Sequence, residues 1–97
     1  MIIRFVKLEI RLQHIQEFKK LTSGEKEDII AFPGCSYLEI LQDVSNPSVF
    51  FTVSHWKSED DLNTYRNSDF FQGNWAKVKQ WFSAKPEAWS LSNHHRY

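Results

Sequence analysis

The stretch that decides the fold is Phe32-Pro33-Gly34-Cys35 with the two segments that follow it, Ser36–Asp43 and Val49–Trp56. The Pro-Gly pair is typical of a turn that ends a helix. In the first of the two segments apolar and polar residues alternate, which predicts a strand, and the second has the β-branched and aromatic residues of another. The run Ser45-Asn46-Pro47-Ser48 between them is typical of a turn. This part of the chain therefore predicts a β-hairpin that follows a helix.

Upstream of the hairpin, the sequence predicts one strand and one helical region. Ile2–Ile10 has the pattern of a strand. A helix is expected from about Gln13 to the Pro33-Gly34 turn, and its apolar stripe begins with Ile15, Phe18 and Leu21. Gly24 either divides this helix in two or weakens it by about 1 kcal/mol.

Downstream of the hairpin, two serines are placed to cap helices. Ser58 has Asp61 three residues on, as in a capping box, and its helix is expected to reach about Asn67. Ser68 opens a second helix, which is expected to end near Phe82. The buried stripe of that helix is predicted to be Phe71, Trp75, Val78 and Phe82. A short last strand is expected over Ala88–Ser92.

This order of elements predicts an α+β fold. It is a ferredoxin-like, four-stranded antiparallel sheet with helices on one face. A chain of 97 residues is expected to form a single domain, 1–97.

The apolar residues of Val49–Trp56 predict a homodimer. Val49, Phe51 and Val53 point to the face opposite Phe50, so both faces of this strand are apolar. Helices can cover only one face, and the chain has no spare element for the other. An uncovered apolar face would be a liability, and a second copy of the sheet is the simplest cover, which would make a dimeric α/β barrel.

Composition and charge exclude several classes of partner. The chain has 12 Lys and Arg and 12 Asp and Glu, so it lacks the basic excess of a protein that binds nucleic acid or an anionic membrane. No apolar run approaches the ~20 residues of a membrane span. The N-terminus enters a strand pattern without a signal-peptide layout, and Cys35 is the single cysteine. A cytoplasmic location is therefore expected.

The sequence also predicts that the protein has no metal or bound cofactor. No two of His14, His55, His94 and His95 have helical ligand spacing, and three glycines leave no phosphate-binding loop. The purified protein should accordingly show no flavin, heme or stoichiometric metal. Cys35 has no nearby base and is interpreted as a small buried residue rather than a nucleophile.

A set of polar and aromatic residues predicts a binding pocket. Period-two geometry places Thr52, Ser54 and Trp56 on one face of their strand. If this face is turned to the helices, Tyr65 and Trp75 could close the space above it. Such a slot suits a small hydrophobic or aromatic ligand, although the same aromatics could simply fill a small core.

The whole layout resembles the antibiotic biosynthesis monooxygenase family, whose members are small dimeric α+β barrels. The matching features are Pro33-Gly34-Cys35, the strand ending in Trp56, Ser58-Glu59 after it, and Ser68 before Phe70-Phe71. The resemblance covers nearly the whole chain.

The chain departs from the family at several positions that often carry chemistry. Where many members have a Glu and two His, this chain has Ser54, Tyr65 and Phe70. Where members that oxidise polycyclic phenols without a cofactor have an Asn and a Tyr, it has Thr52 and Leu62, although it keeps Trp56. Where the heme-degrading branch has an Asn, a Trp and its proximal His, this chain has Val6, Tyr65 and Trp75. The missing His argues against heme, because an indole cannot replace an iron ligand.

The resemblance implies a cofactor-independent monooxygenase that acts on a small aromatic or quinol-type substrate. Trp56 would stack on or position the substrate, and Trp75 would help to enclose it. The polar candidates are Tyr65, Ser54 and Thr52, and His55 would be a base only if it faces the pocket. The alternative is a non-catalytic or isomerase-like small-ligand-binding protein on the same scaffold.

Overall fold

The computed structural model describes residues 1–95, so residues 96–97 of the expected domain lie outside the described part. The strands are β1 (Ile2–Glu9), β2 (Cys35–Gln42), β3 (Val49–Trp56) and β4 (Glu87–Leu91). The helices are α1 (Ile15–Ile30), preceded by the 3-10 turn η1 (Leu12–His14), α2 (Glu59–Arg66) and α3 (Asp69–Lys79).

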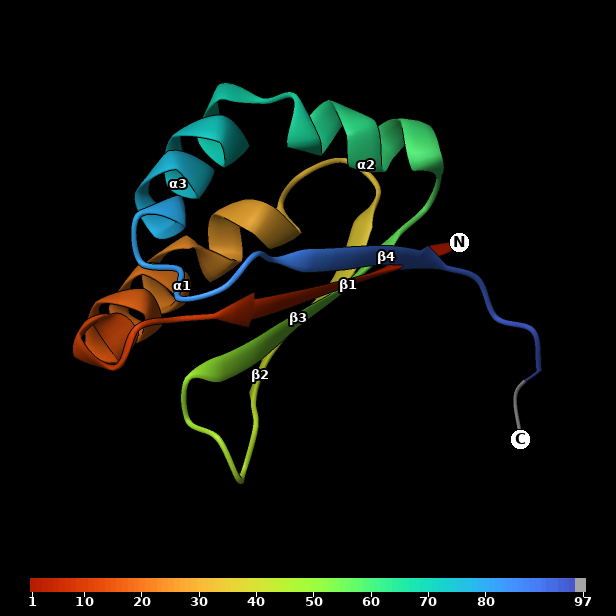
Figure 1. The fold of residues 1–97 in the computed structure, drawn as a ribbon. Coiled ribbons are helices and arrows are strands. Elements are labelled where there is room, and N and C mark those ends of the chain that lie inside the picture. Colours follow the sequence, from red (N-terminus) through yellow and green to blue (C-terminus); the bar gives the residue numbers. More distant parts are fainter. Residues whose placement is uncertain (96–97) are drawn as a thin grey trace.

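The four strands form one antiparallel sheet in the order β2-β3-β1-β4, and the three helices lie on one side of it (Figure 1). The two central strands, β3 and β1, come from distant parts of the chain and pair along their whole length. This arrangement confirms the predicted α+β, ferredoxin-like fold.

Most element boundaries agree with the sequence pattern within a residue or two, but two differences stand out. The helix α1 runs unbroken through Gly24, where a side chain would meet open space. The predicted end of α3 at Phe82 is wrong, because the helix stops at Lys79 and the chain turns so that Phe82 pairs with Ile10. Phe82 still packs edge-on against Trp75. It therefore joins the predicted apolar stripe of α3 from the turn that follows the helix.

The hydrophobic core lies between the sheet and α1, with α3 closing one end. Its buried side chains are Leu8, Ile10, Ile15, Phe18, Phe50 and Val78. Phe18 of α1 packs directly on Phe50 of β3, with 4.6 Å between the ring centroids. The core therefore fills only part of the space under the helices.

Both predicted helix caps are present. The Ser58 hydroxyl oxygen accepts a hydrogen bond from the backbone N–H of Asp61, and Ser68 does the same for Phe71, each at 3.1 Å. These bonds satisfy N–H groups that a helix start leaves unpaired. They also set where α2 and α3 begin, and so where their inward side chains lie over the sheet.

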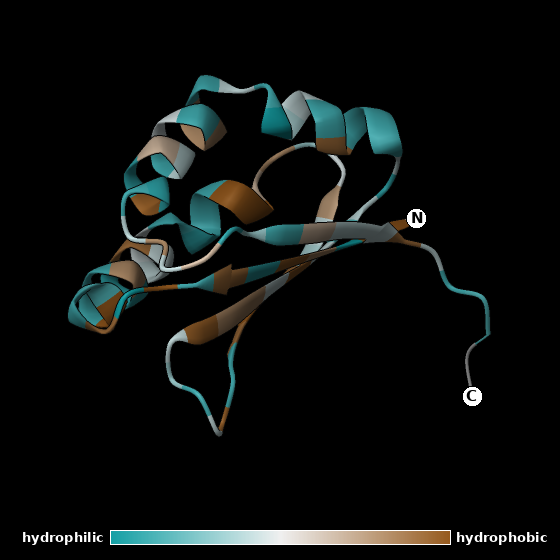
Figure 2. Cartoon of the chain, in the orientation of Figure 1, coloured by the Kyte–Doolittle hydropathy of each residue, from teal (hydrophilic) through white to brown (hydrophobic). Residues whose placement is uncertain are grey.

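No helix of residues 1–95 covers the other face of the sheet (Figure 1). Val49 and Val53 are already buried within the single chain, and Phe51 is half-buried. The side chains on this face that remain exposed by about two-fifths are Tyr37, Leu41, Trp89 and Leu91. Hydrophobic residues gather at the start of β3, whereas the helices are mainly hydrophilic outside (Figure 2).

In the described residues, no helix has the length and apolar character needed to cross a membrane.

Candidate functional site

A cavity of about 420 Å³ lies between the sheet and the helices. Every strand and all three α-helices contribute to its walls. The five pocket residues expected from the sequence all line it: Thr52, Ser54, Trp56, Tyr65 and Trp75. A cavity of this size is within the usual range for small-molecule sites, and most of its lining is apolar.

Strand register explains why distant residues meet on the floor of this cavity. Ser54 of β3 lies opposite Leu38 of β2 on one side and Arg4 of β1 on the other. Arg4 in turn lies opposite Ser90 of β4. Because neighbouring residues in a row across a sheet point to the same face, all four side chains are directed toward the helices.

A continuous series of aromatic rings forms one wall. Tyr65 of α2 stacks on Trp56 of β3 at 5.0 Å between centroids and contacts the edge of Phe71 at 5.1 Å. Phe71 then stacks on Trp75 within α3 at 5.8 Å. Such arrangements contribute about 0.5–1.5 kcal/mol per pair beyond the area they bury. The wall therefore offers a flat apolar surface.

The structure changes the expected role of Trp56. Its side chain is 0% exposed, since Tyr65 covers its ring, and its indole N–H donates to the Ser54 hydroxyl oxygen at 2.9 Å. Trp56 cannot stack on a ligand while Tyr65 covers it. Trp56 and Ser54 instead form a buried support that holds Tyr65 in place. Of the expected binding residues, Thr52, Tyr65 and Trp75 keep exposed surface.

His55 does not face the cavity. It lies on the opposite face of β3, where its ring packs against Tyr37 at 4.7 Å. The alternation of side chains along a strand requires this, because Ser54 and Trp56 on either side point inward. The condition under which His55 would act as a base in the pocket is therefore not met.

Glu25 of α1 is a cavity residue that the sequence reasoning missed. It belongs to the series Phe18, Thr22, Glu25 and Ile29, which has the i, i+4, i+7, i+11 spacing of a buried helix face. A carboxylate at such a position is the signal that could have revealed it. Within residues 1–95, its Oε2 atom is buried and has no hydrogen-bond partner.

The surroundings of Glu25 favour its protonated form near neutral pH. Burial is the main cause, and it raises the pKa of Glu25 to about 7, with a further contribution from Asp28. Lys77 opposes this shift but does not cancel it. A carboxyl group with this pKa can both accept and release a proton under physiological conditions.

The surroundings of Tyr65 keep its phenol protonated and make it a hydrogen-bond donor. Burial raises the pKa of Tyr65 above its ordinary value, and the nearby Glu25 and Cys35 raise it further. The phenol therefore stays protonated at neutral pH. It can donate a hydrogen bond to a ligand oxygen, but it is a poor base.

Two arginines also line the cavity. Arg4 of β1 donates from Nη1 to the Ser90 hydroxyl oxygen at 2.9 Å, and Arg66 is in the last turn of α2. Burial, followed by repulsion from Arg66, lowers the pKa of Arg4, although a guanidinium remains charged at neutral pH. No group of three or more His, Cys, Asp or Glu side chains that could hold a metal ion exists in residues 1–95.

The family of the chain follows from its sequence as well as its fold. The family model "Antibiotic biosynthesis monooxygenase" matches residues 1–96, and the chain belongs to this family. No curated protein sequence matches the chain.

Solved structures show the same fold at low sequence identity. A conserved protein from Methanosarcina mazei Go1 is 24% identical, with a TM-score of 0.87 over 94% of this chain and 91% of its own. A Nitrosomonas europaea protein named for the same family is 19% identical, with a TM-score of 0.89 over 98% of this chain and 100% of its own. A Deinococcus radiodurans protein, also named for the family, is 15% identical, with a TM-score of 0.90 over 100% and 96%. At these identities the likeness is evidence of the fold alone.

Proposed function

We propose that this protein is a cofactor-independent monooxygenase that oxidises a small aromatic substrate of phenol or quinol type. The observation that carries the proposal is the half-buried carboxyl group of Glu25, whose Oε2 atom is buried without a hydrogen-bond partner, in a cavity with an aromatic wall. Family membership and the monooxygenase names of structural neighbours support the reaction class.

The chemistry needs little from the protein beyond binding and proton transfer. A deprotonated phenol is electron-rich enough to reduce O2 itself, so that a carbon–oxygen bond forms at the ring. Loss of water from the resulting peroxide gives a quinone. For a naphthol, one ring C–H becomes a carbonyl, one atom of O2 enters the product, the other leaves as water, and the substrate supplies all four electrons.

In this proposal Glu25 is the general base that removes the phenolic proton. Tyr65 donates a hydrogen bond to the oxyanion that forms, which a protonated phenol can do at neutral pH. Thr52 and Trp75 contact the substrate, and Trp56 and Ser54 hold Tyr65. The proposed active form is a cytoplasmic homodimer joined through the sheet face opposite the helices.

An oxygen electrode tests the proposal directly. With a panel of naphthols and quinols, the wild-type protein should consume oxygen faster than the buffer for at least one compound, and isotopically labelled O2 should label the quinone carbonyl. Glu25→Gln should lower kcat by about 10²-fold or more, as expected for loss of a general base. Tyr65→Phe should lower kcat by about 10²-fold with little change in binding. Oxygen uptake that is unchanged in Glu25→Gln would overturn the proposed mechanism.

The second candidate is a small-ligand-binding or isomerase-like protein on the same scaffold. It is favoured by Ser54, Tyr65 and Phe70, which occupy positions where many family members carry Glu or His. In that case no compound in the panel should cause oxygen uptake. Tyr65→Phe should then change affinity by about 0.5–1.5 kcal/mol, the contribution of one hydrogen bond.

A further inference from the structure

We propose that the ligand of this cavity carries a carboxylate group, and that Arg4 and Arg66 bind it while the aromatic wall binds the planar remainder. The inference rests on the proposed function only in taking the cavity as the substrate site. It adds the chemical class of the substrate, an aromatic acid.

The first ground is that the two cations belong to one site. Arg4 comes from the central strand β1, and Arg66 from the end of α2 above it, yet both line the same cavity. Burial lowers the pKa of Arg4, and the charge of Arg66 lowers it further. Arg4 is half-buried and Arg66 is exposed, and like charges that line one cavity repel each other, so an anion bound between them would be favourable.

The second ground is that this pair has no counter-charge in residues 1–95. The ion pairs there are Lys7 with Glu87 and His14 with Glu17, and neither involves the cavity arginines. The hydrogen-bond partner of Arg4 is the neutral hydroxyl of Ser90. That bond uses one of the five N–H donors of the Arg4 guanidinium.

The carboxyl group of Glu25 does not serve as that counter-charge. The charged groups that act on it are Lys77 and Asp28, and its Oε2 has no hydrogen-bond partner. The cavity therefore has its acid on α1 and its cations on β1 and α2.

Arg66 also stabilises α2 by its position in the last turn of that helix. A cation there interacts favourably with the helix dipole, by about 0.3–1 kcal/mol. The helix dipole does not account for a cation at Arg4, because Arg4 lies within strand β1 and faces the helices. The pairing of the two, rather than either alone, is what points to an anion.

A carboxylate suits this pair because its two oxygens match the planar fork of a guanidinium. The experiment compares two probes of nearly equal shape that cannot be turned over, naphthoate and its neutral amide, naphthamide. Calorimetry on the purified protein at low and high salt measures their affinities. Naphthoate should bind about 10-fold or more tightly than naphthamide, and added salt should reduce the difference.

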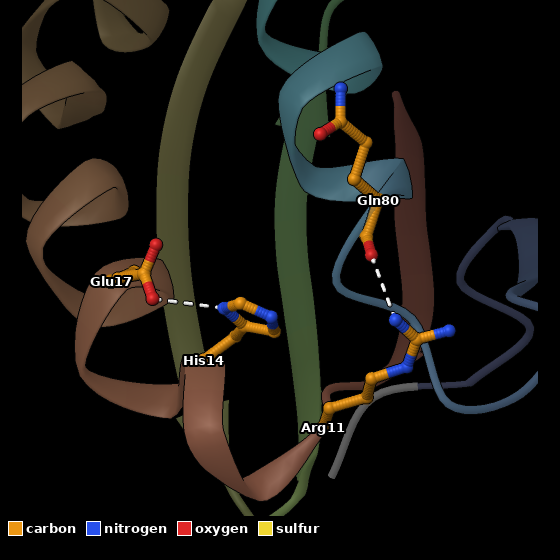
Figure 3. A network of polar contacts seen from close by, with 4 residues as sticks. All are labelled: Arg11, His14, Glu17 and Gln80. Carbon is orange, nitrogen blue, oxygen red and sulfur yellow. Dashed lines mark hydrogen bonds and ion pairs between the residues drawn. The ribbon is translucent and has the colours of Figure 1, made fainter.

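Arginine variants identify the site of this preference. Arg66→Gln changes an exposed residue and should lower the affinity for naphthoate about 10-fold or more while lowering that for naphthamide much less. Arg4→Gln should do the same. The matched control is Arg11→Gln, because the Arg11 guanidinium lies outside the cavity and donates to the Gln80 backbone carbonyl at 3.4 Å (Figure 3). Arg11→Gln should keep the full preference.

Three outcomes would overturn the inference: equal binding of the two probes, a preference that survives both cavity variants, or no binding of either probe up to about 1 mM. None of them bears on the oxygenase proposal, which is tested by oxygen uptake with other compounds. Conversely, a naphthoate preference that depends on Arg4 and Arg66 would stand even if no compound caused oxygen uptake.

Discussion

Glu25 is the residue on which the proposed chemistry of the site depends most. It occupies a position in α1 where the neighbouring turns place Phe18 and Ile29, so the helix turns a carboxyl group toward the sheet. Burial raises the pKa of this group to about 7. The same shift has consequences for activity and for stability, and each can be measured.

The proposed oxygenase activity should rise with pH through about 7. The proposed base, Glu25, can accept a proton only when it is deprotonated, so kcat/KM should increase about 10-fold per pH unit below its pKa and level off above it. The measurement is a pH profile of oxygen uptake, corrected for uncatalysed oxidation of the substrate. An absence of this rising limb in the wild-type protein would contradict the role of Glu25 as base.

The stability of the fold should fall as pH rises from about 4.5 to about 7. In this window the folded protein holds the Glu25 proton while the unfolded chain has lost it, because the folded pKa is the higher one. Deprotonation therefore costs folding free energy, by about 1 kcal/mol once screening of this half-exposed group is included. Urea unfolding should show this slope in the wild-type protein and lose it in Glu25→Gln.

At the scale of elements, the turn between α1 and β2 depends on Gly34. Its φ of +85° lies in the left-handed region, where a side chain is strained. A Cβ atom there would also overlap the side chain of Asp61 at the start of α2. The turn that follows α1 thus packs closely against the start of α2.

Gly34→Ala should therefore lower the free energy of unfolding by about 1–3 kcal/mol. The matched control is Gly24→Ala, since Gly24 lies in the middle of α1 with open space around it. That change should stabilise the protein by about 0.5–1 kcal/mol, because alanine has the better helix propensity. Urea denaturation at one protein concentration measures both. Equal effects of the two substitutions would contradict this account of the turn.

At the scale of the whole molecule, the uncovered sheet face makes a prediction about assembly. We expect a homodimer in which two such faces pack together. Trp89→Glu and Phe51→Glu should each give a monomer or an unfolded chain, because they would place a charge in the apolar interface. Trp89 is the sharper test, since it is 43% exposed in the single chain and its replacement disturbs the core less.

The control for assembly is Val44→Glu. Val44 is fully exposed in the loop between β2 and β3, so this change adds the same charge away from the proposed interface. Sedimentation should show a dimer for the wild-type protein and for Val44→Glu. A well-folded wild-type monomer at micromolar concentration would rule out the dimer.

The strands, the caps and the faces of this molecule were predictable because they depend on local chemistry. The alternation within Val49–Trp56 is enough to place Thr52 and Ser54 on one face, and Ser58 and Ser68 are recognisable as caps from their neighbours alone. The end of α3 was not predictable from its stripe, because Phe82 is held by pairing with Ile10, far away in sequence.

The sequence by itself determined which residues can share a face of a strand or a helix, since that depends only on the period of the element. Only the tertiary structure decided which faces meet and what lies between them. Arg4 reaches Ser90 across 86 positions of sequence, and Tyr65 covers Trp56 because α2 folds back over β3. The proton affinity of Glu25 likewise depends on burial by elements brought together in folding, which no local pattern contains.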